Sequence, residues 1–200
     1  PEGVISGTIT VSDGKITAIE KGIKDADAID YGNHRVIPGI FDTHNHGTCG
    51  FDPANGQHLP KEQAKQQIRG YLKGLASQGV TSIFPTVVES DALSNIAEVA
   101  EEHEAIGAEI LGIHSEGPWL NRVGEKGIRT GWPEISVEKA EKMVSDSKGW
   151  LKLVAIAPEI PGAYEVIEYF LSQGITVAAA HSDNHYKEAM EGYAKGISVA

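Results

Sequence analysis

An apolar run changes abruptly into a polar, histidine-rich end in Val36-Ile37-Pro38-Gly39-Ile40-Phe41-Asp42-Thr43-His44-Asn45-His46-Gly47. The apolar part lacks the alternation of a half-exposed strand and is typical of a strand covered on both faces. Similar runs recur along the chain, so we predict strands at Val36–Thr43, Val80–Thr86, Ile110–Glu116, Leu153–Pro158 and Ile175–His181, with a sixth beginning at Ile197.

Amphipathic helices are predicted between these strands. Apolar residues recur at helical spacing in two sets, Ala64, Ile68, Tyr71, Leu72 and Leu75, and Val166, Ile167, Phe170 and Leu171. Strands that alternate with such helices form βα units around a parallel sheet. The sequence from residue 36 onward therefore predicts an α/β fold.

A (β/α)8 TIM-type barrel and an open doubly wound sheet both consist of such units. The polar residues lie at the strand ends, and no Gly-rich phosphate motif of the GxGxxG or GxxxxGKS/T type follows a strand. We therefore predict an incomplete barrel over residues 36–200, with about five βα units and the start of a sixth strand. Because the chain lacks an initiator Met and ends in an apolar run, we expect it to be a fragment.

Residues 1–35 have a different pattern. Two short alternating runs, Ile5–Val11 and Lys15–Ile19, flank Ser12-Asp13-Gly14. Asp-Gly between alternating runs is a strong signal for a β-hairpin. We expect a β appendage that forms part of a small β-sandwich.

Composition excludes several kinds of partner. The chain of 200 residues has 17 Lys plus Arg, 28 Asp plus Glu and a formal net charge of −11, which repels nucleic acid and anionic lipid. No apolar run approaches the roughly 20 residues of a membrane span. Cys49 is the single cysteine, so no intrachain disulfide can form, and we expect a cytoplasmic protein.

The first predicted strand ends in a possible metal site. Side chains alternate in a strand, so Asp42, His44 and His46 project to one side. Two histidines at i and i+2 can chelate a divalent ion, and Asp42 could orient one imidazole. A solvated polar loop is the alternative interpretation.

Two further strand ends carry potential ligands. Glu116 ends the third predicted strand and His181 the fifth. Taken singly, Glu116 could instead form an ion pair with Arg122 or Lys126. A closed barrel brings the carboxyl ends of its strands to one rim, so the coincidence with His44 and His46 favours a metal site.

These motifs together resemble the amidohydrolase superfamily. Residues 36–47 resemble its first-strand motif, and His114-Ser115-Glu116-Gly117-Pro118-Trp119-Leu120-Asn121 resembles the glutamate motif of its deacetylases of N-acetylglucosamine 6-phosphate. Ala157-Pro158-Glu159 and Ala180-His181-Ser182 match further family segments in the same order. The resemblance covers nearly the whole chain.

Carried over to this sequence, the resemblance implies that Glu116 and His181 bind a principal metal ion. His44 and His46 can hold a second ion, and Glu116 can bridge the two. The expected cofactor is a divalent metal, zinc or iron, with one or two ions per chain. A further histidine ligand and the acid/base aspartate of the family fall beyond Ala200, so we expect this piece alone to be inactive.

Two residues are expected near the substrate. Gly117 directly follows the glutamate, and Arg129 stands where the family usually has a substrate-contacting histidine. This departure leaves the exact sugar open, because a cation there can meet a different hydroxyl, carboxylate or phosphate pattern.

The resemblance implies metal-dependent hydrolysis of the acetamide of N-acetylglucosamine 6-phosphate, or of a related N-acetyl amino sugar, by a metal-bound hydroxide. Acetate and the amino sugar phosphate are the products. The expected partners are this small molecule and a second copy in a homodimer, with no nucleic acid or membrane. Two alternatives stay open: another amidohydrolase acting on a cyclic amide, dipeptide or other N-acyl compound, and a noncatalytic metal-binding or sugar-sensing barrel.

Overall fold

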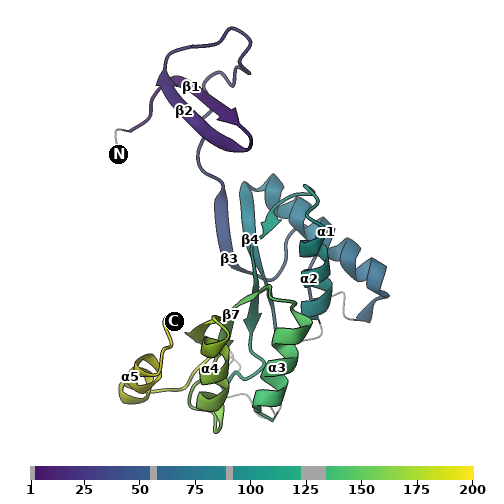
Figure 1. Cartoon of the computed structure of the whole chain (residues 1–200), viewed down its shortest axis with the longest axis vertical. Coiled ribbons are helices and arrows are strands. Elements are labelled where there is room, and N and C mark those ends of the chain that lie inside the picture. Colours follow the sequence, from purple (N-terminus) through teal and green to yellow (C-terminus); the bar gives the residue numbers. More distant parts are fainter. Residues whose placement is uncertain (1–2, 55–57, 89–91, 123–133) are drawn as a thin grey trace. The chain divides into compact units, whose positions relative to one another are not determined.

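The computed structural model describes residues 3–54, 58–88, 92–122 and 134–200 (Figure 1). The chain divides into two compact units, Pro1–Pro38 and Gly39–Ala200. In chain order, the elements are β1 (Gly7–Ser12), β2 (Lys15–Lys21), β3 (Ile40–Asn45), α1 (Lys61–Ser77), β4 (Val80–Val87), α2 (Leu93–Glu101), β5 (Glu109–Ile110), β6 (Ile113–Glu116), α3 (Val137–Asp146), β7 (Leu151–Ile156), α4 (Ala163–Ser172), β8 (Thr176–Ala179) and α5 (Tyr186–Ala194).

The first unit is built on the predicted hairpin. Strands β1 and β2 pair antiparallel, with an irregularity between Thr10 and Val11. The turn residues Asp13 and Gly14 both have positive φ, 52° and 70°, as a tight two-residue hairpin turn requires. The described residues of this unit form a single two-stranded sheet, and its membership in a β-sandwich, which needs a second sheet, stays a prediction.

The second unit is a parallel half-barrel. Its strands follow the order β3-β4-β6-β7-β8, with β5 paired to β4. Every pairing in this sheet is parallel, and helices connect successive strands, as Figure 1 shows. The predicted α/β architecture is therefore confirmed, and the carboxyl ends of the strands share one edge.

Helix burial follows the predicted apolar faces. On α1, Ile68, Tyr71 and Leu75 are buried, and on α4, Val166 and Phe170 are buried. Each face packs toward the sheet, so the apolar side chains leave water as the helix docks. Within the described part of the chain, no helix has the length and apolar character needed to cross a membrane.

Strands β4, β7 and β8 differ from the predicted bounds by one or two residues at their ends, so that β8 ends at Ala179 and His181 follows it. Three other differences are larger. The first strand of the half-barrel begins at Ile40 rather than Val36, after Pro38, which has no N–H to donate to a ladder. The third predicted strand divides into β5 and β6 around Gly112, where a Cβ would lie 2.4 Å from Lys152 Cγ. The expected sixth strand is represented by one isolated parallel bridge, Ala178 to Val199.

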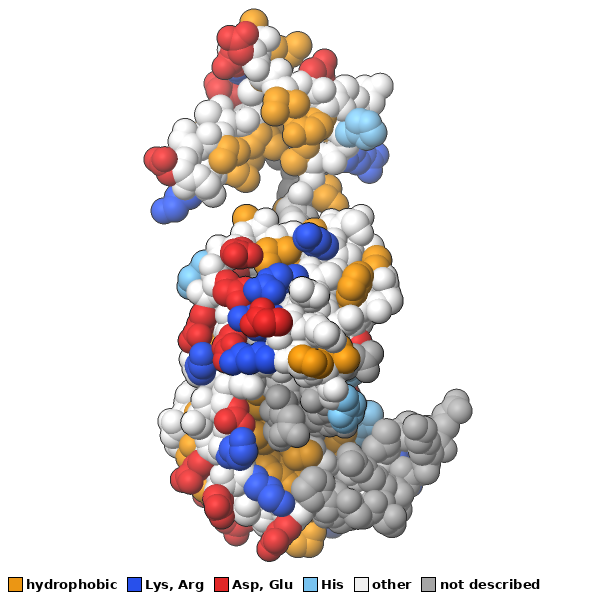
Figure 2. All heavy atoms as spheres, turned by 90° about the vertical axis from the view of Figure 1, so that its right-hand side faces the viewer, with side chains coloured by type: hydrophobic (Ala, Val, Ile, Leu, Met, Phe, Trp, Pro, Cys, Tyr) orange, Lys and Arg blue, Asp and Glu red, His pale blue; other side chains and the backbone are white. Residues whose placement is uncertain are grey.

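The solvent face of the helices carries mixed charge, with acidic and basic side chains interspersed in Figure 2. Lys61 of α1 pairs with Glu98 of α2 at 2.7 Å. Lys65 and Arg69, one and two turns further along α1, both pair with Glu102. These contacts join α1 to α2 and to the residue that directly follows α2.

Candidate metal centre

The carboxyl ends of β3 and β6 bring three potential ligands together. His44 and His46 come from the end of β3, and Glu116 is the last residue of β6. One ligand atom from each lies within 4.8 Å of the other two. Because β4 separates the two strands in the sheet, the cluster depends on sheet curvature as well as on strand order.

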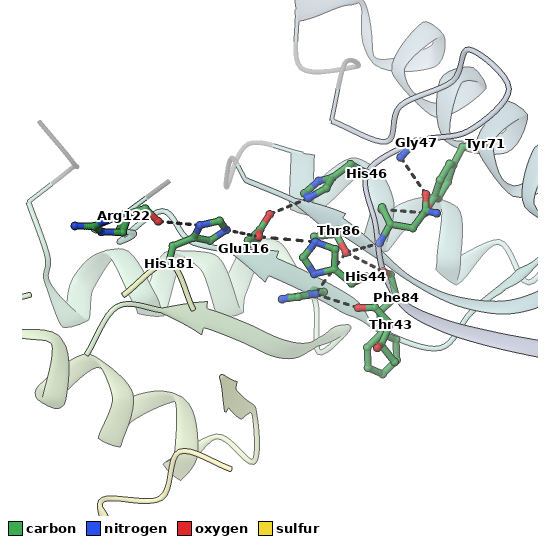
Figure 3. A network of polar contacts seen from close by, with 12 residues as sticks. Thr43, His44, His46, Gly47, Tyr71, Phe84, Thr86, Glu116, Arg122 and His181 are labelled. Carbon is green, nitrogen blue, oxygen red and sulfur yellow. Dashed lines mark hydrogen bonds and ion pairs between the residues drawn. The ribbon is translucent and has the colours of Figure 1, made fainter. Parts of the chain in front are cut away.

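Glu116 is the centre of the cluster. One carboxylate oxygen, Oε2, lies 2.8 Å from His46 Nε2. The other, Oε1, lies 2.7 Å from His181 Nε2 and 3.8 Å from His44 Nε2. Figure 3 shows the carboxylate between His181 on one side and the His44 and His46 rings on the other. The structure therefore brings together all four predicted metal ligands.

The glutamate of the cluster and its strand-end histidines differ in their exposure to solvent. The side chain of Glu116 is 11% exposed, whereas those of His44 and His46 are 50% and 46% exposed. Burial acts to raise the pKa of Glu116, but the hydrogen bond from His181 and the nearby imidazoles outweigh it and lower that pKa. The carboxylate is therefore ionised and held in place, while the imidazoles remain accessible from solvent.

The tautomer of His181 tests whether the site suits a cation. Its Nδ1 lies 2.9 Å from the carbonyl oxygen of Arg122, which can only accept, so Nδ1 carries the proton. The other nitrogen, Nε2, faces a Glu116 oxygen 2.7 Å away: it donates a hydrogen bond to that oxygen when it carries a proton, and presents a lone pair to it when it does not. Two lone pairs at this distance need a proton or metal ion between them, so the donor set fits a divalent cation.

Imidazole and carboxylate groups together suit zinc or iron. The described site contains three imidazoles and one carboxylate, His44, His46, His181 and Glu116. Such a set can hold one ion or, with the carboxylate as a bridge, two. Bound there, an ion would be reachable through the half-exposed histidines.

Asp42 has a different role from the one considered from sequence. Its Oδ1 accepts from the backbone N–H of His44 at 3.1 Å, and its Oδ2 accepts from the Asn45 side-chain amide at 3.2 Å. The carboxylate thus stabilises the turn at the strand end instead of orienting an imidazole. Thr86 Oγ1 accepts from the Asn45 N–H, and the Tyr71 hydroxyl donates to the Asn45 carbonyl.

His114 is a neighbour of the site that the sequence prediction left out. Its Nδ1 lies 3.0 Å from the Thr43 carbonyl oxygen, and its ring meets that of His44 edge to face at 5.0 Å. Burial lowers the pKa of His114 to about 4, so the ring is neutral near pH 7. Its i, i+2 spacing from Glu116 was the available signal, since both side chains lie on one face of β6.

The remaining predicted residues lie as follows. Gly117 has φ of 104° and donates its N–H to the Ala155 carbonyl at 3.0 Å, so it fixes the chain just after Glu116. Arg129 lies outside the described residues. Of the two alternative ion-pair partners of Glu116, Arg122 pairs instead with Asp183 at 2.8 Å, and Lys126 lies outside the described residues.

The sequence of the chain matches that of known enzymes over most of its length. Residues 35–199 match the profile of the Amidohydrolase family. N-acetylglucosamine-6-phosphate deacetylase of Vibrio furnissii is 36% identical over 94% of this chain and 49% of its own length. The Bacillus subtilis enzyme of the same name is 28% identical over 91% of the chain and 48% of its own length.

Solved structures agree on the fold. The N-acetyl-D-glucosamine-6-phosphate deacetylase of Mycobacterium smegmatis superposes with a TM-score of 0.71, at 23% identity, over 92% of this chain and 51% of that chain. The enzyme of the same kind from Thermotoga maritima gives a TM-score of 0.63 at 26% identity, over 94% and 48%. The chain spans about half the length of these relatives. On the match of its sequence over residues 35–199, it belongs to the amidohydrolase family.

Proposed function

We propose that this chain supplies the first half of the catalytic barrel of a metal-dependent deacetylase. The substrate class is an N-acetylated amino sugar 6-phosphate, with N-acetylglucosamine 6-phosphate first. The observation that carries the proposal is the Glu116 carboxylate, which three imidazoles surround at the strand ends. Relatives that bear the name of this deacetylase support the substrate class, and a variant of the Mycobacterium smegmatis enzyme has been solved in complex with N-acetyl-D-glucosamine-6-phosphate.

In this proposal, Glu116 and His181 would hold one ion, and His44 and His46 beside Glu116 could hold a second. Zinc or iron fits these donors. A divalent ion at this rim supplies Lewis acidity, which polarises a carbonyl and lowers the pKa of water. The chain itself fixes the ligands: Glu116 through burial and its contacts with His46 and His181, and His44 and His46 through the Asp42 and Asn45 turn.

Substrate contacts are assigned to Gly117 and Arg129. Gly117 lies at the rim directly after Glu116, the last residue of β6. A guanidinium at position 129 would pair with an anionic or hydroxyl-rich part of the sugar phosphate. We assign the acid/base step to an aspartate outside these 200 residues, and the working assembly to a homodimer.

The test uses protein expressed from the complete reading frame and loaded with zinc or iron. Acetate release from N-acetylglucosamine 6-phosphate is the expected result, and Glu116→Gln and His181→Asn should abolish it together with metal binding. The epimeric N-acetylgalactosamine 6-phosphate, a cyclic amide and an N-acyl amino acid serve as competing substrates. Turnover of one of these instead would contradict the substrate, and a metal-loaded protein without any hydrolysis would support a noncatalytic barrel.

A further inference from the structure

Glu159 lies just beyond the end of β7 and does not belong to the proposed ligand set. Its carboxylate accepts three hydrogen bonds. Oε1 accepts from Asn121 Nδ2 at 2.8 Å and from the backbone N–H of Asp183 at 2.6 Å. Oε2 accepts from Ser182 Oγ at 2.9 Å. Glu159 therefore ties the segment that follows β6 to the segment that follows β8.

The segment after β8 contains His181 in an unusual backbone conformation. Its φ is 50°, in the left-handed region that side chains with a Cβ disfavour. Such a conformation persists only where surrounding contacts hold it. The His181 carbonyl accepts from the N–H groups of Asn121 and Arg122 at 3.0 and 2.6 Å, and the Arg122 carbonyl faces its Nδ1.

The contacts of Glu159 and those of His181 involve the same two segments, residues 121–122 and 181–183. Residues 121–122 hold the His181 backbone and ring, while Glu159 holds Asn121 on one side and residues 182–183 on the other. The ion pair between Arg122 and Asp183 links the same segments. The side chains of Arg122 and Asp183 are 49% and 42% exposed, so solvent screens the attraction between their charges. Glu159 is partly buried, so its hydrogen bonds are the connection between the two segments that is better shielded from solvent.

We propose that Glu159 is a positioning residue: its three hydrogen bonds hold segments 121–122 and 181–183 together and thereby aim His181 Nε2 at Glu116. The consequence for metal affinity rests on the proposed function. The consequence for backbone order does not, because every contact involved is made by the chain itself. The role differs from that of Glu116, which faces the imidazoles directly.

A conservative variant separates hydrogen bonding from charge. In Glu159→Gln, the amide oxygen can still accept from Asn121 and Asp183, which share one oxygen, and the amide nitrogen can donate to Ser182 Oγ. Glu159→Leu keeps a similar size but accepts nothing. Glu165→Leu is the matched control, since Glu165 is an exposed glutamate on the neighbouring helix α4.

Two measurements are made on protein from the complete reading frame. Zinc affinity, from competition with a chelator, is expected to fall about 10–100-fold in Glu159→Leu, as when a residue that orients a ligand is lost. In metal-free protein, hydrogen exchange at the Asp183 amide is expected to rise about tenfold, the equivalent of one hydrogen bond. Glu159→Gln should stay within about threefold of wild type in both, and Glu165→Leu should change neither.

The outcomes separate the two proposals. Wild-type affinity and exchange in Glu159→Leu would overturn the positioning role, and equal losses in the Gln and Leu variants would overturn it by assigning the effect to charge. If the wild-type protein binds no zinc, the proposed function fails, and the exchange measurement alone decides the role of Glu159. If Glu159→Leu does not fold, Ser182→Ala removes one of the three hydrogen bonds and should give a smaller change in the same direction.

Discussion

Replacing Glu116 by glutamine should remove most of the stabilisation that a metal ion gives this protein. The change preserves the size of the side chain but takes away the negative charge. Glu116 is the sole carboxylate in the described ligand cluster, and His44, His46 and His181 all face it within 3.8 Å. Metal ligation needs the ionised carboxylate, so the neutral amide is a much weaker ligand.

The expected size follows from linkage. An ion present at about 100 times its dissociation constant stabilises the folded state by about 2.7 kcal/mol. Loss of a residue that only orients a ligand weakens metal affinity by about 10–100-fold, so loss of Glu116, a ligand itself, should weaken it at least about 100-fold. At the same ion concentration the variant then gains about 0.4 kcal/mol, which leaves a difference of about 2.3 kcal/mol.

Urea unfolding of wild type and Glu116→Gln, with zinc and with chelator, measures this difference. Subtracting the chelator curve removes any effect of the substitution on the metal-free fold. Glu165→Gln, an exposed glutamate on α4, is the control and should respond to zinc as wild type does. An equal zinc-dependent gain in wild type and Glu116→Gln would refute the assignment of Glu116 as a ligand.

Three other predictions concern the scaffold. Tyr71→Phe removes the hydroxyl bond to the Asn45 carbonyl and should cost about 1 kcal/mol of unfolding free energy in urea. Phe170→Ala, in the fully buried face of α4, should cost about 3–5 kcal/mol, and a smaller loss would mean that the helix repacks. Burial acts to raise the pKa of Glu102, but the hydrogen bonds and charges of Lys65 and Arg69 outweigh it, so that pKa is lowered. The ion pairs of Glu102 therefore stabilise the folded state at neutral pH, and this stabilisation is lost as the pH falls through the lowered pKa. At pH 7, the unfolding free energy of wild type should accordingly exceed that of Glu102→Gln by up to about 1 kcal/mol, and this difference should vanish in acid. A difference that does not change with pH would contradict this reasoning.

Much of the half-barrel can be predicted from sequence because its signals are local. The spacing of Ile68, Tyr71 and Leu75 reports a helix face, and their burial confirms it. Strand alternation likewise predicts that His44 and His46 share one side. The bounds of the third strand could not be predicted in this way, because the break at Gly112 depends on the close approach of Lys152 from the adjacent strand.

The sequence by itself determined which residue types end each strand, because strand periodicity and the run from apolar to polar residues are properties of neighbours along the chain. Only the tertiary structure decided that Glu116 lies between His46 and His181, and that His114 is buried against His44. It also decided that Glu159 joins two segments near His181. These contacts join residues that are far apart in sequence. Sheet curvature and loop contacts set the distances between them, and neither produces a periodic pattern in the sequence.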